Sequence, residues 1–204
     1  MVESPPKGYV KKAVIDLASE PRIKVSAILL GLALIVAVSV AMARYVDIVR
    51  PGDLDLGIIE DQEGRISISF DAGSLLSYFT VLVLVLISHE LLHGVVFWRV
   101  SGETPVVGLK GIFIYVSAPP SVYFPRNKYL WVGAAPIISL TLIGVLLVPF
   151  VPPSLLLLDV LFVALNAAGS AADLVMIFML HQYPSSSLIQ DLGSGMVIYE
   201  LSTP

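Results

Sequence analysis

Long apolar stretches separated by short polar connections dominate the pattern of hydrophobic and polar positions. Four stretches reach the roughly 20 predominantly apolar residues that a helix needs to cross the hydrocarbon core of a bilayer. They run from about Val25 to Ala43, from about Leu75 to Trp98, from about Tyr129 to just before Pro149, and from about Ser154 to Leu180. The pattern therefore predicts four membrane-spanning helices.

The segments outside these spans carry shorter patterns. Residues 9–19 are expected to form an amphipathic surface helix that Pro21 stops. Short β-like runs separated by turn residues predict hairpins. Their strands are expected at 56–59 and 65–70 around an acidic turn at 60–64, at 106–109 and 112–117, and at 187–190 and 196–201.

The predicted fold class is therefore an all-α transmembrane bundle of four membrane-spanning helices, with short β-hairpin elements in the extramembrane loops and tail. We expect one integral membrane domain over residues 1–204. It divides into an N-terminal segment (1–23), a four-helix core (24–183) and a tail with a β-hairpin (184–204).

Composition agrees with a membrane location and limits the chemistry. The chain is 56% hydrophobic and only 14% charged, whereas soluble domains are about 25% charged. The net charge of -4, without a basic stripe, argues against a nucleic-acid partner. The chain has no cysteine and three histidines, so a metal would need His, Asp, Glu or Asn as ligands.

The distribution of Lys and Arg predicts the orientation in the membrane. Five basic residues precede the first span and four lie between the second and third, whereas the loop after the first span has three against seven acids. Both termini should therefore be cytoplasmic in a multi-pass protein of the cell membrane. Ala41-Met42-Ala43 resembles a signal-peptidase site, but the 19 uncharged residues of this span exceed the usual 7–15 of a signal peptide. We expect an uncleaved anchor.

The sequence His89-Glu90-Leu91-Leu92-His93 lies inside the second span, where ionisable groups are costly unless they are paired or ligated. On a helix, two histidines four residues apart share a face and can bind one zinc ion, and the intervening glutamate can act as general base. The motif indicates a metalloprotease that works inside a membrane. The alternative is a chance pattern whose polar groups are satisfied by neighbouring helices.

A catalytic zinc site usually has three protein ligands, and depth along the helices suggests the third. A rise of about 1.5 Å per residue puts His93 and His89 roughly 8–14 Å from the cytoplasmic end of their span. Asp173 lies at roughly 12 Å by the same measure on the fourth span. Among the competitors, His181 is too shallow, Asp159 lies near the opposite face, and Glu103 and Glu200 lie outside the spans.

The region 88–94 around the motif, Ala134-Ala135-Pro136, and the stretch from Asn166 to Asp173 together resemble a known pattern. They are similar to the zincin peptidase family of integral membrane proteins, which are small relatives of the site-2 intramembrane zinc metalloproteases. The resemblance covers the second to fourth spans. It implies that His89, His93 and Asp173 hold Zn²⁺ and that Glu90 is the catalytic general base.

Two departures concern substrate handling. The aspartate of site-2 proteases is typically followed by glycine, but Leu174 follows Asp173, and their Asn-Pro pair is Ala135-Pro136 here.

The expected substrate is a membrane protein or peptide. Its transmembrane helix must unwind locally, because a helix hides its carbonyls in its own hydrogen bonds. Asn166 and Pro136 are candidate substrate-binding residues. Asn166 could instead brace the site, and Pro136 could be an ordinary packing kink. An edge strand from residues 106–117 could capture the unwound substrate by β-addition.

Three other functions are also compatible with the sequence. A degenerate protease could bind zinc and client helices without turnover, although a pure binder has no need of Glu90. A small transporter or channel subunit would have its polar cluster accessible from both faces of the membrane. A gluzincin-type membrane protease would use a downstream glutamate in place of Asp173.

Overall fold

The computed structural model describes residues 5–16, 19–56, 58–60, 66–68, 72–110 and 113–202. In chain order it contains β1 (Tyr9–Asp16), α1 (Pro21–Val49), β2 (Ile58–Glu60), β3 (Ile66–Ile68), α2 (Ala72–Ser101), β4 (Val106–Lys110), β5 (Phe113–Ser117), β6 (Phe124–Pro125), α3 (Arg126–Leu147), α4 (Pro153–Gly169), α5 (Ala171–Leu180), β7 (Leu188–Asp191) and β8 (Gly195–Leu201).

Four helical spans among the described residues are long and apolar enough to cross a membrane, in agreement with the prediction. They are α1, α2, α3 and the combined segment Pro153–Leu180. Many of their outward side chains are apolar and exposed, such as Leu29, Val36, Leu84 and Leu146. Such an apolar exterior suits lipid, so the structure is compatible with a multi-pass membrane protein.

The fourth span is interrupted at Ser170, between α4 and α5. The hydroxyl of Ser170 donates a hydrogen bond to the carbonyl of Asn166, at 2.9 Å, and serine bonds of this kind bend helices. Helix α1 approaches closely here, because a Cβ on Gly31 would lie 3.2 Å from the carbonyl oxygen of Ala168. Small residues thus let the helices meet beside the break.

The N-terminal segment is a strand, so the prediction of an amphipathic helix over residues 9–19 is wrong. Strand β1 pairs antiparallel with β8, Tyr9 opposite Leu201 and Asp16 opposite Gly195. It completes a four-stranded antiparallel sheet in the order β1-β8-β7-β6. The predicted all-α bundle with short hairpins is therefore incomplete, because the helical bundle also carries a four-stranded sheet built from both terminal segments and β6.

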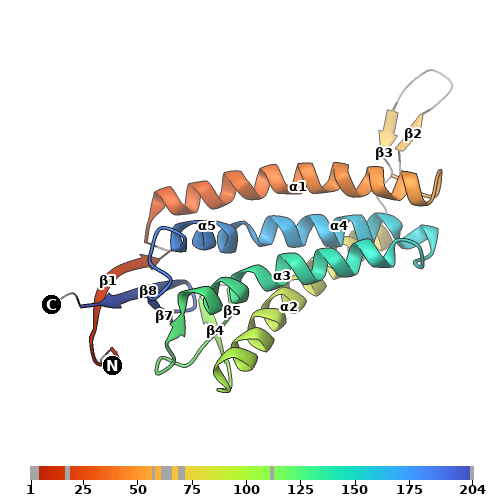
Figure 1. The fold of residues 1–204 in the computed structure, drawn as a ribbon. Helices are drawn as coiled ribbons and strands as arrows, with labels where there is room; N and C mark the ends of the chain where they lie inside the picture. The colour runs from red at the N-terminus through yellow and green to blue at the C-terminus, as the bar shows by residue number, and fades with distance from the viewer. Residues whose placement is uncertain are drawn as a thin grey trace.

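The sheet and both chain termini lie at one end of the bundle, and the β2–β3 hairpin lies at the other (Figure 1). The expected acidic turn at 60–64 falls mostly outside the described residues. The predicted hairpins in the loop after α2 and in the tail are confirmed as β4–β5 and β7–β8.

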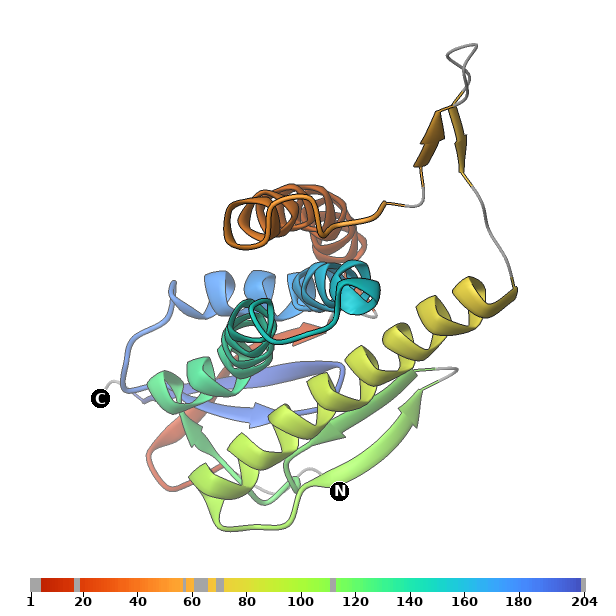
Figure 2. The ribbon, with the colours of Figure 1, turned by 90° about the vertical axis from the view of Figure 1, so that its right-hand side faces the viewer.

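The β4–β5 hairpin runs alongside α2, which crosses the bundle obliquely (Figure 2). Helix and hairpin approach closely where α2 has a glycine. A Cβ on Gly94 would lie 3.3 Å from Cγ1 of Val116 and 3.8 Å from Cγ of Pro105. This packing brings strand β5 next to the turn of α2 that holds the histidines.

Candidate metal centre

Two helices supply the polar side chains of the candidate site. His89, Glu90 and His93 lie on α2, and Asp173 lies in the first turn of α5, just after the break at Ser170. Both histidines are buried, at 8% and 9% exposure. The structure thus brings the sequence-predicted residues of the second and fourth spans together.

His89, His93 and Asp173 form a group whose ligand atoms all lie within 4.8 Å of one another. The two Nε2 atoms are 3.2 Å apart, and Oδ2 of Asp173 lies 3.2 Å from Nε2 of His89 and 3.5 Å from Nε2 of His93. Tetrahedral ligation at about 2.0–2.2 Å separates ligand atoms by about 3.3–3.6 Å. The three separations are close to the edges of such a tetrahedron.

The outer nitrogen of each histidine is held by an acceptor on another helix. Nδ1 of His93 lies 3.0 Å from the carbonyl oxygen of Val132 and therefore donates to it. Nδ1 of His89 lies 3.1 Å from Oδ1 of Asn166, while Nδ2 of Asn166 donates to the carbonyl oxygen of Pro136 at 3.1 Å. The amide orientation of Asn166 follows from this network.

These contacts determine whether the Nε2 atoms of the two histidines carry a hydrogen or a lone pair. In neutral rings with hydrogen on Nδ1, both Nε2 atoms carry lone pairs that face each other and the carboxylate of Asp173. Oδ2 of Asp173 is buried and has no hydrogen-bond partner. Converging lone pairs repel unless a cation lies between them, so the donor set fits a metal ion.

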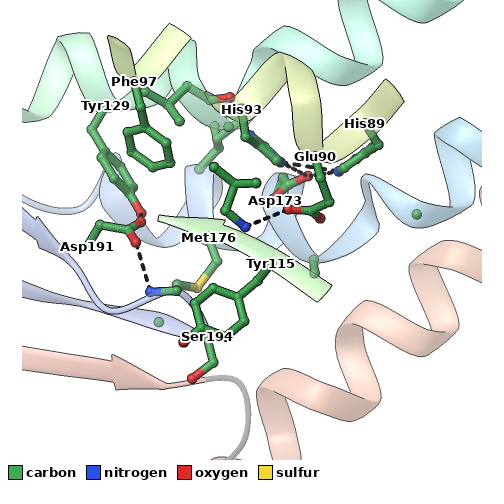
Figure 3. Close-up of a pocket in the computed structure, with 18 of the residues that line it drawn as sticks. His89, Glu90, His93, Phe97, Tyr115, Tyr129, Asp173, Met176, Asp191 and Ser194 are labelled. Atoms are coloured by element: carbon green, nitrogen blue, oxygen red, sulfur yellow. Dashed lines mark hydrogen bonds and ion pairs between the residues drawn. The ribbon is translucent and has the colours of Figure 1, made fainter. Parts of the chain in front are cut away.

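Glu90 lies beside this group, and one of its carboxylate oxygens is held by the neighbouring hairpin. Its Oε2 accepts a hydrogen bond from the backbone N–H of Val116 on β5, at 2.9 Å. Figure 3 shows the Glu90 carboxylate next to Asp173, with the β5 strand on its other side. Glu90 therefore connects the histidine helix to the edge of the β4–β5 hairpin.

The group opens into a cavity of about 220 Å³ that extends toward the tail hairpin. Its far wall includes Tyr129, Asp191 and the turn at Gly193 (Figure 3). The hydroxyl of Tyr129 donates to Oδ2 of Asp191, and Oδ1 of Asp191 accepts from the N–H of Gly193 at 2.8 Å. Burial raises the pKa of Asp191 to about 6, although these two hydrogen bonds act in the opposite direction.

Tyr115 closes the cavity from the side of the β4–β5 hairpin. It packs so closely on Gly193 that a Cβ there would lie 2.2 Å from its ring. Gly193 also has φ +79°, which side chains other than glycine rarely adopt. The tail turn and the hairpin thus meet over the site.

The other residues singled out from the sequence lie away from the cavity lining. Asn166 is fully buried behind His89, and Pro136 is buried in α3. The prediction that these two residues bind substrate stays a prediction. Asp159 is also buried, facing Gly144 of α3, and it does not line this cavity.

Tyr129, Asp191 and the backbone groups of Val132 and Val116 also belong to the site, and they were not predicted from the sequence. Tyr129, at the start of the third predicted span, lines the cavity. Asp191 follows a predicted tail strand. It lines the cavity only because the tail folds over the site, which its local sequence does not indicate. Pro136 was the one sequence signal for Val132, because proline leaves the carbonyl four residues earlier without its helical donor.

Comparisons with known proteins agree with this geometry at the level of the family. No curated protein matches the chain, and no solved structure does. One protein family matches over residues 82–188, a stretch that contains His89, Glu90, His93 and Asp173. Because the match covers more than half of the sequence, the chain belongs to the family described as "Putative zincin peptidase", which implies a zinc metallopeptidase.

Proposed function

We propose that this protein is a zinc-dependent intramembrane metalloprotease that hydrolyses peptide bonds of membrane-embedded substrates. The convergence of His89, His93 and Asp173 next to Glu90, within helices long and apolar enough to span a bilayer, is the observation that carries the proposal. The family supplies the class of chemistry, and the apolar helices supply the location.

His89, His93 and Asp173 would hold the zinc ion. A zinc ion held by three protein ligands activates water and polarises a carbonyl group. The chain's own contribution is to fix the ligands. Asn166 and the carbonyl of Val132 hold the two rings so that both Nε2 atoms point to one place.

Glu90 would be the general base. It takes a proton from the attacking water and later delivers it to the leaving amine, which a carboxylate within reach of both can do. The hydrogen bond from Val116 fixes one oxygen of this carboxylate and leaves the other without that constraint. The base is thus held beside the cavity.

The outer edge of β5 would receive the substrate. β5 pairs with β4 along one edge, and the N–H of Val116 points away from β4 toward Glu90. An unwound substrate segment could add to this edge as a further strand. The scissile bond would then lie close to the carboxylate of Glu90, because Glu90 is itself bound to this strand at Val116.

We further propose that the two termini and the site face the cytoplasm of a multi-pass protein in the cell membrane. The sheet formed by both terminal segments lies at the same end of the bundle as the site (Figure 1). Basic residues are frequent in the segments at this end, whereas acidic residues dominate the loop at the other.

Cleavage of a membrane-tethered reporter tests the function. The full chain in proteoliposomes should cleave it, and Glu90→Gln should abolish cleavage while the protein still binds one zinc per chain. Glu103→Gln is the matched control, because Glu103 is an exposed acid outside the cavity, and it should keep full activity.

A fully active Glu90→Gln variant would refute the general-base assignment. If the wild-type protein bound zinc but cleaved no membrane substrate, the result would favour a non-proteolytic zinc-binding membrane protein.

A further inference from the structure

Two backbone carbonyls of helix α3, one turn apart, help to hold the histidines of the metal group, one by direct contact and the other through Asn166. The carbonyl of Val132 accepts from Nδ1 of His93. The carbonyl of Pro136 accepts from Asn166, which in turn accepts from Nδ1 of His89. Most backbone carbonyls of a helix are not available in this way, because each already accepts a hydrogen bond from the N–H four residues later.

Val132 is an exception because the residue four positions later is proline. Proline has no N–H, and its ring pushes against the carbonyl four residues before it. Helix α3 nevertheless continues through this point, from Arg126 to Leu147. The carbonyl of Val132 therefore lacks its helical donor and is turned to another partner, and that partner is His93.

We propose that Pro136 is a positioning residue that sets the tautomer of His93. By withholding an N–H it leaves the carbonyl of Val132 for His93, which keeps the hydrogen on Nδ1 and the lone pair on Nε2. The ring is then ready to bind a metal before the metal arrives. This assignment rests on the metal site of the proposed function, and it gives Pro136 a role without direct substrate contact.

If Pro136 only kinked the helix for packing, replacing it would leave the zinc affinity and the tautomer of His93 unchanged. The proposal predicts a different result. Pro136→Ala supplies the missing N–H, and the helical hydrogen bond to Val132 then competes with His93. Alanine is also the better helix former, so the thermal midpoint of the metal-free protein should stay the same or rise. Zinc affinity should fall about 10- to 100-fold, as it does when an outer partner of a metal-binding histidine is lost.

The experiment uses the full chain in nanodiscs. Zinc affinity is measured by competition with a chelator, and the tautomers are read from ¹⁵N chemical shifts of the histidine rings in the metal-free protein. Wild-type His93 should carry its hydrogen on Nδ1, and Pro136→Ala should move part of the population to Nε2. Ile138→Ala is the matched control, because Ile138 lies on the same helix two residues from Pro136, is exposed and does not line the cavity. It should preserve both the affinity and the tautomer.

His181 provides an internal reference, because its Nδ1 lies 2.8 Å from the carbonyl of Ile177 and should not respond. Pro136→Ala with unchanged tautomer and zinc affinity within twofold of wild type would overturn the proposal. A wild-type His93 with its hydrogen on Nε2 would overturn it without any variant. Failure of the wild type to bind zinc would instead refute the proposed function, while the tautomer comparison would still decide the role of Pro136.

Discussion

Replacing Asn166 by leucine should weaken zinc binding without emptying the space that the side chain fills. Asn166 is fully buried, and its Oδ1 is the acceptor for Nδ1 of His89 at 3.1 Å. Leucine has a similar volume but no acceptor, so the N–H of His89 loses its partner. A buried donor left unpaired costs about 1–3 kcal/mol, which corresponds to a loss of about 5- to 150-fold in affinity.

The assay is chelator competition for zinc on the purified full chain, with the thermal midpoint of the metal-free protein measured in parallel. Asn166→Asp is the matched control, because it keeps an oxygen for His89, while a carboxylate oxygen replaces the N–H donor that faces the carbonyl of Pro136. A carboxylate is a common partner of metal-binding histidine, so this variant should stay within about threefold of wild type. Equal zinc affinity of Asn166→Leu and wild type, or equal losses in the two variants, would show that Oδ1 of Asn166 does not hold His89 for the metal.

Two further predictions concern stability. Burial raises the pKa of Asp191 from 3.8 to about 6, so the folded protein holds this proton more tightly than the unfolded chain does. The free energy of unfolding should therefore fall, by at most about 3 kcal/mol, as the pH rises from about 4 through about 6. Asp191→Asn should flatten the corresponding fall in thermal midpoint. Gly144→Ala would place a Cβ 2.1 Å from Cγ2 of Val163 and should cost about 1–3 kcal/mol. Gly169→Ala has open space within 4 Å and should be neutral or slightly stabilising in the same melting assay, and equal effects of the two would contradict the packing.

The four spans could be predicted because each depends on local composition alone. A run of about 20 apolar residues is sufficient evidence for a helix in a bilayer, and the helix ends differ from the predicted ends by a few residues. The break at Ser170 was not predicted, because a serine that bends a helix has the same sequence signature as one that does not. The break changes the depth of Asp173 along the span very little, so Asp173 and the two histidines could be predicted to lie at one level, and the structure brings them together.

The N-terminal strand could not be predicted from its own sequence. Residues 9–16 pair with residues 195–201, and a pairing over that separation leaves no local signal that distinguishes a strand from an amphipathic helix. The tail hairpin was predictable, because both of its strands and the turn are adjacent in the chain.

The partners that hold the histidines were beyond sequence reasoning for a different reason. One is a backbone carbonyl, which every residue has, and only the proline at position 136 marks Val132 as special. The contact of Glu90 with Val116 is likewise a contact with backbone, and it exists because the β4–β5 hairpin packs against α2. Residue types alone do not encode such contacts.

X-ray absorption at the zinc edge of the intact, purified protein decides whether His89, His93 and Asp173 hold a zinc ion. We predict one zinc per chain, with two imidazole nitrogens at about 2.0–2.1 Å and a carboxylate oxygen at about 2.0–2.2 Å. The imidazole signal should weaken in His89→Ala, and the carboxylate signal should disappear in Asp173→Ala. A protein without zinc, or zinc whose spectrum is unchanged by both substitutions, would show that these three residues do not form a zinc site.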